Sequence, residues 1–136
     1  GVNRKMEPWV IGIDKPREGV DHKNRFQVIL EISDISLATS GNYRKFYTDE
    51  KTGIKYVHTI DPKTGYPVKS NLLSATILTN DCMSADAFAT SCMVMGFDKS
   101  VRLIESSQSI QGYLIYVNEQ GKISEWYSQE FENYMR

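Results

Sequence analysis

The sequence predicts an α+β fold, with a mostly antiparallel sheet and helices packed on one of its faces. Two observations support this fold class. Short β-rich segments separated by polar turns fill the first half of the chain, and small and apolar residues recur with helical spacing after the segment at 72–79. The length of 136 residues, with 40% hydrophobic and 24% charged residues, predicts a single domain over 1–136 with its own core.

The first half of the chain is expected to form an antiparallel meander. A strand at Trp9–Ile13 ends in a loop containing Pro16 and Gly19, and Ser40-Gly41-Asn42 reads as a turn. The other strands are expected at 26–32, at 35–38, and at 43–47 and 55–60, the last two pairing across the polar connection at 48–53.

The second half alternates between sheet and helix. We expect Leu72–Thr79 to be a central strand, followed by a helix that stops at Gly96. A second short helix is expected from Asp98 through Ile104. A hairpin formed by 112–117 and 122–127 follows, and the tail at 128–136 is helical or frayed.

Composition excludes some function classes. The net charge of −1 comes from interspersed acidic and basic residues without a basic stripe, which argues against nucleic-acid and membrane-surface binding. Cys82 and Cys92 are too few for a disulfide framework, and Cys92 is expected to pack inside a helix. The start at Gly1, without a signal-peptide core, suggests a piece of something longer.

His58 is the first candidate for chemistry. It ends a short apolar run and precedes Asp61-Pro62 and Thr64-Gly65-Tyr66-Pro67, which predict a rigid loop beside a strand end. Catalytic groups are often mounted at such places. A hydrogen-bonded structural histidine is the alternative interpretation of the same pattern.

Asp86 and Thr90 are the second candidate. Their spacing of four places both on one helix face, where a carboxylate and a hydroxyl suit a hard cation such as Mg2+. The structural alternative is an acid favoured by the helix dipole near the helix start, and a threonine bonded to the backbone one turn back.

Three motifs, read in order, resemble the C-terminal half of the ApbE family, the FAD:protein FMN transferases. They are Thr39-Ser40-Gly41-Asn42-Tyr43, His58-Thr59-Ile60-Asp61-Pro62-Lys63-Thr64-Gly65 and Asp86-Ala87-Phe88-Ala89-Thr90. The segment Trp9–Pro16 also resembles the strand and loop upstream of the family's serine-glycine turn, so the resemblance spans nearly the whole chain. It implies an ApbE-like fold related to the T-fold.

The resemblance also implies a reaction and a set of site residues. In such enzymes Mg2+ is held partly by an Asp and a Thr four residues apart, here Asp86 and Thr90, and FAD is the substrate. His58 is the implied base toward the threonine hydroxyl of an acceptor flavoprotein, to which FMN is transferred with release of AMP. His58, Ile60, Ser40 and Thr64 are the implied contacts to the flavin nucleotide.

The chain departs from the family pattern in two ways, and it leaves alternatives open. The family is more than twice as long, so a missing N-terminal half is an implied partner, and Asn42 stands where an Asp is common. A Mg2+-dependent FAD pyrophosphatase giving FMN and AMP, or a non-catalytic flavin-nucleotide binding module, are the competing interpretations. The resemblance further implies an extracytoplasmic enzyme on the periplasmic side of the inner membrane, often a lipoprotein.

Overall fold

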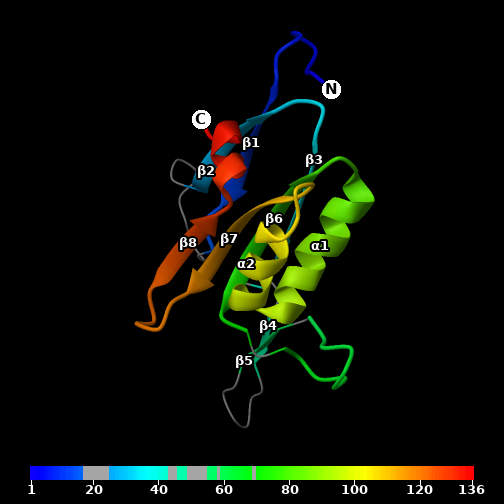
Figure 1. Cartoon of the computed structure of the whole chain (residues 1–136). Coiled ribbons are helices and arrows are strands. Elements are labelled where there is room, and N and C mark those ends of the chain that lie inside the picture. Colours follow the sequence, from blue (N-terminus) through cyan, green and yellow to red (C-terminus); the bar gives the residue numbers. More distant parts are fainter. Residues whose placement is uncertain (17–24, 43–45, 49–54, 58, 69) are drawn as a thin grey trace.

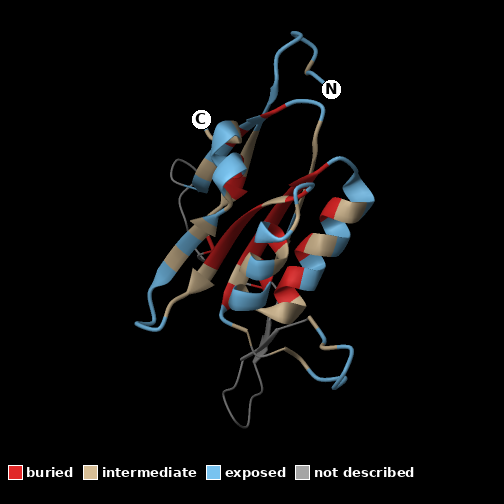
Figure 2. Cartoon of the chain, in the orientation of Figure 1, coloured by how far each residue is buried: buried red, intermediate tan, exposed pale blue. Residues whose placement is uncertain are grey.

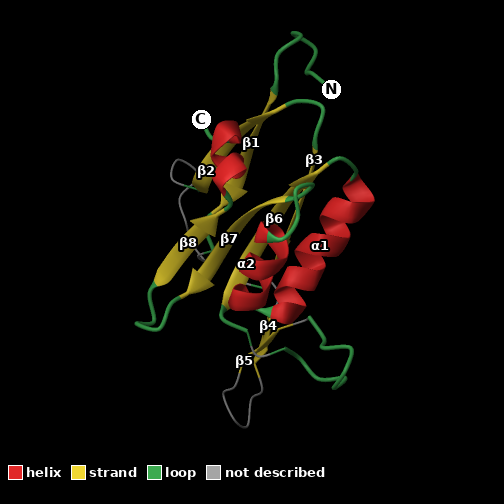
Figure 3. Ribbon diagram, in the orientation of Figure 1, coloured by secondary structure: helices red, strands yellow, loops and turns green. Residues whose placement is uncertain are grey.

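A computed structural model of the chain describes residues 1–16, 25–42, 46–48, 55–57, 59–68 and 70–136. Its centre is a four-stranded antiparallel sheet in the order β3-β6-β7-β8 (Figure 3). These strands are β3 (Ser36–Gly41), β6 (Leu72–Thr79), β7 (Gln111–Val117) and β8 (Ile123–Tyr127). Strand β6 lies between two neighbours and is almost entirely buried, as predicted for a central strand.

Two helices, α1 (Cys82–Met95) and α2 (Phe97–Glu105), pack on one face of this sheet (Figure 1). Helix α1 contacts β3 and β6, and α2 contacts β7. Successive side chains of a strand point to opposite faces of the sheet, so every second side chain faces the helices. The buried core between helices and sheet consists of Leu72, Ala75, Ile77, Ala89, Cys92, Met93, Ile104, Ile110 and Leu114.

The two ends of α1 follow from local chemistry. The Asp81 side chain accepts a hydrogen bond from the Ser84 amide at 2.9 Å and caps the helix start. Gly96 ends the helix with φ of 80° and ψ of 176°, a conformation open essentially only to glycine. Cys92 is fully buried between these ends, which confirms its predicted packing role. Burial also raises the pKa of its thiol.

A hairpin of β1 (Trp9–Asp14) and β2 (Phe26–Ile32), together with a 3-10 helix η2 (Gln129–Tyr134), covers the opposite face of the sheet. Figure 2 shows the buried residues concentrated in the central strands and on the inner sides of these elements. The core on this side consists of Ile13, Leu30, Ile32, Leu78, Tyr113, Ile115 and Phe131.

Tyr113 ties the hairpin to the sheet. Its hydroxyl donates to the Glu125 carboxylate, which also accepts a hydrogen bond of 2.9 Å from Nε2 of Gln27 on β2. Burial raises the pKa of the Tyr113 hydroxyl far above its ordinary value, and the bonded Glu125 carboxylate raises it further. The phenol therefore stays a donor at physiological pH.

The α+β class, the helices on one face and the hairpin of β7 and β8 are confirmed. The predicted pairing of 43–47 with 55–60 is confirmed for β4 (Phe46–Thr48) and β5 (Lys55–Val57), while 43–45 and 58 lie outside the described residues. The C-terminal tail is helical rather than frayed, because Phe131 is fully buried and Met135 bridges to Leu30.

Two sequence predictions about β3 were wrong. It pairs with β6, far along the chain, so the first strands form separate antiparallel pairs rather than one meander. Ser40 and Gly41 are not a turn, because they continue β3 opposite Ala75 and Ser74.

Among the described helices none is long and apolar enough to span a membrane.

Candidate active site

Ser40 is the next-to-last residue of β3, an edge strand of the central sheet. It pairs with Ala75, whose side chain lies in the core under the helices, so Ser40 faces the same way. Its Oγ lies 3.1 Å from Oγ1 of Thr90 on α1, and the two hydroxyls share a hydrogen bond. A predicted nucleotide contact and a predicted metal ligand are therefore neighbours in space.

Asp86 lies one helical turn before Thr90, and both side chains are exposed. The acid at the helix start is Asp81, not Asp86, and the hydrogen bond from Ser84 holds the pKa of the Asp81 carboxyl below its ordinary value. Asp86 makes no hydrogen bond or ion pair with any residue in the described part of the chain. Among the described residues, no contact supports the structural alternative, in which Asp86 is the acid at the helix start and Thr90 bonds the backbone one turn back.

The loop from Thr59 to Val68 is held by its own backbone (Figure 1). The Asp61 carbonyl accepts from the Gly65 amide at 2.8 Å, and the Asp61 amide donates to the Tyr66 carbonyl at 2.9 Å. The Val68 amide donates to the Thr59 carbonyl at 3.0 Å. These bonds give the loop a hydrogen-bonded backbone, with Gly65 at a φ of 72° that favours glycine.

The loop is fastened to the end of β3 by one side-chain contact. Oγ1 of Thr59 donates to Oδ1 of Asn42 at 2.8 Å, and Asn42 is only 6% exposed. The backbone N–H of Asn42 donates to the Leu73 carbonyl at 3.0 Å, which extends the pairing of β3 with β6. The loop is thus anchored at Asn42, two residues beyond Ser40 and at the same end of the strand.

The loop residues singled out from the sequence differ in their surroundings. Ile60 forms an isolated bridge with Pro67 and is 47% exposed, so its side chain is open to a ligand. Thr64 is exposed, and its Oγ1 accepts from the Tyr66 amide at 3.3 Å, so this hydroxyl serves its own turn. His58 lies outside the described residues.

The donor set on α1 and β3 fits Mg2+ in chemical type. Asp86 offers a carboxylate, and Thr90 and Ser40 offer hydroxyls, which are the hard oxygen ligands that this ion prefers. Among the residues that the structure describes, no group of three or more His, Cys, Asp and Glu side chains could hold a metal. A Mg2+ ion here would therefore need water or substrate phosphate oxygens to complete its octahedral shell.

Comparison with known proteins assigns the chain to a family. A family model described as the ApbE family matches residues 1–114. The chain belongs to the ApbE family. This ApbE chain is 43% identical over 108 residues to the FAD:protein FMN transferase of Vibrio cholerae serotype O1, a match covering 79% of the chain. It is 32% identical over 137 residues to the FAD:protein FMN transferase of Escherichia coli K12, which covers 99% of the chain.

Solved structures of the ApbE family share the fold. The flavin transferase ApbE from Vibrio cholerae superposes with a TM-score of 0.77 at 37% identity, over 98% of this chain and 40% of that one. The ApbE protein from Thermotoga maritima gives a TM-score of 0.74 at 32% identity, over 96% of this chain and 39% of that one. The chain spans about a third of the length of the curated relatives it matches, 31% and 36% for the two named above.

Sequence reasoning missed the contact between Thr59 and Asn42 that fixes the loop. A signal for it was present, because Thr59 lies inside the motif and Asn42 follows the serine-glycine pair. The pairing was hidden because the two positions are 17 apart in the sequence and local patterns predict a meander for the strands between them.

Proposed function

We propose that this chain is part of a FAD:protein FMN transferase that moves the FMN unit of FAD onto a threonine hydroxyl of an acceptor protein. We further propose that residues 1–136 form one domain and the C-terminal part of that enzyme. The observation that carries the proposal is the contact of Ser40 with Thr90, one turn from Asp86, which has no hydrogen-bond or ion-pair partner among the described residues. Family membership and the activity for which the relatives are named support it.

The reaction exchanges the phosphoanhydride bond of FAD for a phosphoester bond to the acceptor threonine. The threonine oxygen of the acceptor forms a bond to the phosphorus of the FMN unit, and the pyrophosphate bond of FAD breaks with AMP as the leaving group. The threonine proton passes to a base, a role that we assign to His58 from its motif. Such transfers need positioning and charge stabilisation more than covalent help from the protein.

The residues of the candidate active site each have a role in the proposed reaction. Asp86 and Thr90 would hold a Mg2+ ion, which when bound offsets negative charge on the pyrophosphate. Ser40 orients Thr90 through the hydrogen bond that they share. The exposed side chain of Ile60 supplies an apolar surface to the flavin nucleotide, on a loop that Thr59 and Asn42 hold in place.

The test uses the full-length product of the gene with FAD, Mg2+ and a threonine-bearing acceptor protein. Covalent flavin on the acceptor, read by in-gel fluorescence and intact mass, is the expected result. Asp86→Asn should reduce labelling at least 100-fold, because it removes the charged ligand. Asp98→Asn is the matched control, since Asp98 is an exposed acid in the first turn of α2.

Other results would replace the proposal with one of its competitors. Release of FMN and AMP without labelled acceptor indicates a FAD pyrophosphatase. If the wild-type protein yields neither labelled acceptor nor free FMN and AMP, and FAD binding survives Asp86→Asn, the protein is a binding module. His58→Ala should reduce transfer far more than FAD affinity, and an equal loss of both would remove the assigned role as base.

A further inference from the structure

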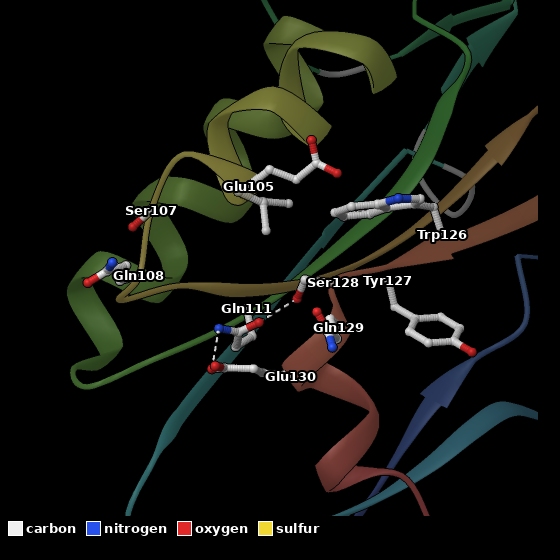
Figure 4. A pocket seen from close by; sticks show the side chains of 10 residues that line it. Glu105, Ser107, Gln108, Gln111, Trp126, Tyr127, Ser128, Gln129 and Glu130 are labelled. Atoms are coloured by element: carbon white, nitrogen blue, oxygen red, sulfur yellow. Dashed lines mark hydrogen bonds between the residues drawn. The ribbon is translucent and has the colours of Figure 1, made fainter.

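A pocket of about 650 Å³ (Figure 4) lies at the β8 edge of the central sheet. The candidate active site lies at the β3 edge. Its walls come from the end of α2 and the residues after it, the start of β7, the end of β8 and the start of η2. The lining residues are Ile104, Glu105, Ser107, Gln108, Gln111, Trp126, Tyr127, Ser128, Gln129 and Glu130. The lining side chains include two carboxylates and an indole, but no Lys, Arg or His.

The floor of this pocket is held by a chain of hydrogen bonds. Oγ of Ser128 donates to Oε1 of Gln111 at 2.6 Å and accepts from the Gly112 amide at 3.0 Å. Nε2 of Gln111 then donates to Oε2 of Glu130 at 3.0 Å (Figure 4). These bonds fix the Glu130 carboxylate, which keeps further lone pairs for a ligand.

The indole of Trp126 forms another wall. It is half-buried and packs against the core beneath the helices, so it is held in place. Figure 4 shows the Glu105 side chain extending from α2 toward this indole. A planar cation between them would meet an aromatic face and a carboxylate together.

Glu105 is an unusual choice for its position. It is the last residue of α2, where the helix dipole disfavours a carboxylate and favours a cation. The last turn of α2 also carries the basic Arg102, but Glu105 itself has no hydrogen bond or ion pair within the described part of the chain. A carboxylate at such a position without a partner of its own is a candidate for a ligand contact.

We propose that this pocket binds an arginine side chain presented by a protein partner. A guanidinium group is planar, stacks on indole and donates through a fixed fork to carboxylates, and the pocket offers Trp126, Glu105 and Glu130 for these contacts. The ammonium of lysine lacks the flat face and the fork. The inference does not rest on the proposed transferase activity, because it concerns the opposite edge of the sheet.

The test is an NMR titration of the full-length gene product labelled with 15N at its tryptophan indoles. Trp126→Phe assigns the Trp126 signal, and Trp9, on β1, is the reference within the same molecule. N-acetyl-arginine amide should shift the Trp126 signal saturably, in the millimolar range expected for one side chain, and leave Trp9 unchanged. N-acetyl-citrulline amide has nearly the same shape without the charge, and should bind roughly tenfold more weakly.

Variants locate the binding. Glu105→Gln and Glu130→Gln should each weaken arginine amide roughly fivefold, as expected for exposed ion pairs. Glu132→Gln should change nothing, because Glu132 lies on η2 but does not line the pocket. No saturable shift, equal binding of citrulline amide, or an unchanged affinity in Glu105→Gln overturns the proposal.

Two further probes test the choice of occupant. Free arginine carries an α-carboxylate that the acidic pocket repels, so it should bind more weakly than the amide. Tighter binding of free arginine would show an amino-acid site and overturn the protein partner. Equal or tighter binding of N-acetyl-lysine amide would overturn the preference for a guanidinium group.

Discussion

Oγ of Ser40 lies 3.1 Å from Oγ1 of Thr90, although the two residues are 50 positions apart in the chain. One belongs to an edge strand and the other to the helix that packs along it. The contact exists only because β3 pairs with β6 and α1 folds back over both strands. The geometry of the proposed metal ligands therefore depends on the packing of α1 against the sheet.

Ser40→Ala should raise the Mg2+ concentration needed for half-maximal FMN transfer by roughly twofold to tenfold. The change removes one hydrogen bond, worth about 0.5–1.5 kcal/mol, that orients the Thr90 hydroxyl. Transfer rates measured across a Mg2+ titration check this. Ser40→Thr keeps a hydroxyl and serves as the control, and an unchanged Mg2+ dependence in Ser40→Ala would show that Thr90 needs no such partner.

Thr59→Val should destabilise the protein by about 1–3 kcal/mol, because it leaves Oδ1 of the buried Asn42 without its donor. Transfer activity should also fall, since this bond fastens the loop carrying Ile60 to the end of β3. Urea denaturation and the transfer assay measure the two effects. Thr59→Ser retains the donor, so a loss of similar size in that variant would contradict the explanation.

Much of the fold could be predicted because local patterns specified it. Strand β6, both helices and the hairpin of β7 and β8 were indicated by the spacing of small and apolar residues and by turn residues, and the structure has them. The stop of α1 at Gly96 was predictable for the same reason, since glycine is the residue that adopts its backbone conformation.

The order of strands was not predictable from local patterns. The local sequence of β3 does not indicate whether its partner is β6, β2 or β4. Pairing depends on side chains that meet only in the folded protein. The motif residues were predictable as a set through the family resemblance. Their contacts, such as Ser40 with Thr90, required the strand order and could not be derived.

Gly112→Ala should destabilise the protein by about 1–3 kcal/mol through overpacking. A Cβ on Gly112 would lie 2.4 Å from Cδ1 of Ile104, a buried residue of α2. Ile104→Val removes that methyl group and alone costs about 0.5–1.5 kcal/mol. In the double variant the two costs should not add, because the deletion makes room for the added methyl. Additive losses in denaturant unfolding would contradict this packing relationship.

Asp81→Ala should lower the melting temperature at neutral pH, because it removes the carboxylate that accepts from the Ser84 amide at the start of α1. That hydrogen bond also lowers the pKa of Asp81 below its ordinary 3.8. A lowered pKa means that the stabilisation is complete above the pKa of the unfolded chain and is lost as the pH falls through the folded value.

The difference in melting temperature between wild type and Asp81→Ala should therefore shrink as the pH falls below 3.8. Differential scanning calorimetry between pH 7 and pH 2.5 measures it. Asp81→Asn is the matched control, because its amide oxygen caps a helix without titrating, so its stability relative to Asp81→Ala should stay constant across that range. A difference between wild type and Asp81→Ala that persists unchanged in acid would mean that the charge of Asp81 contributes nothing to the cap.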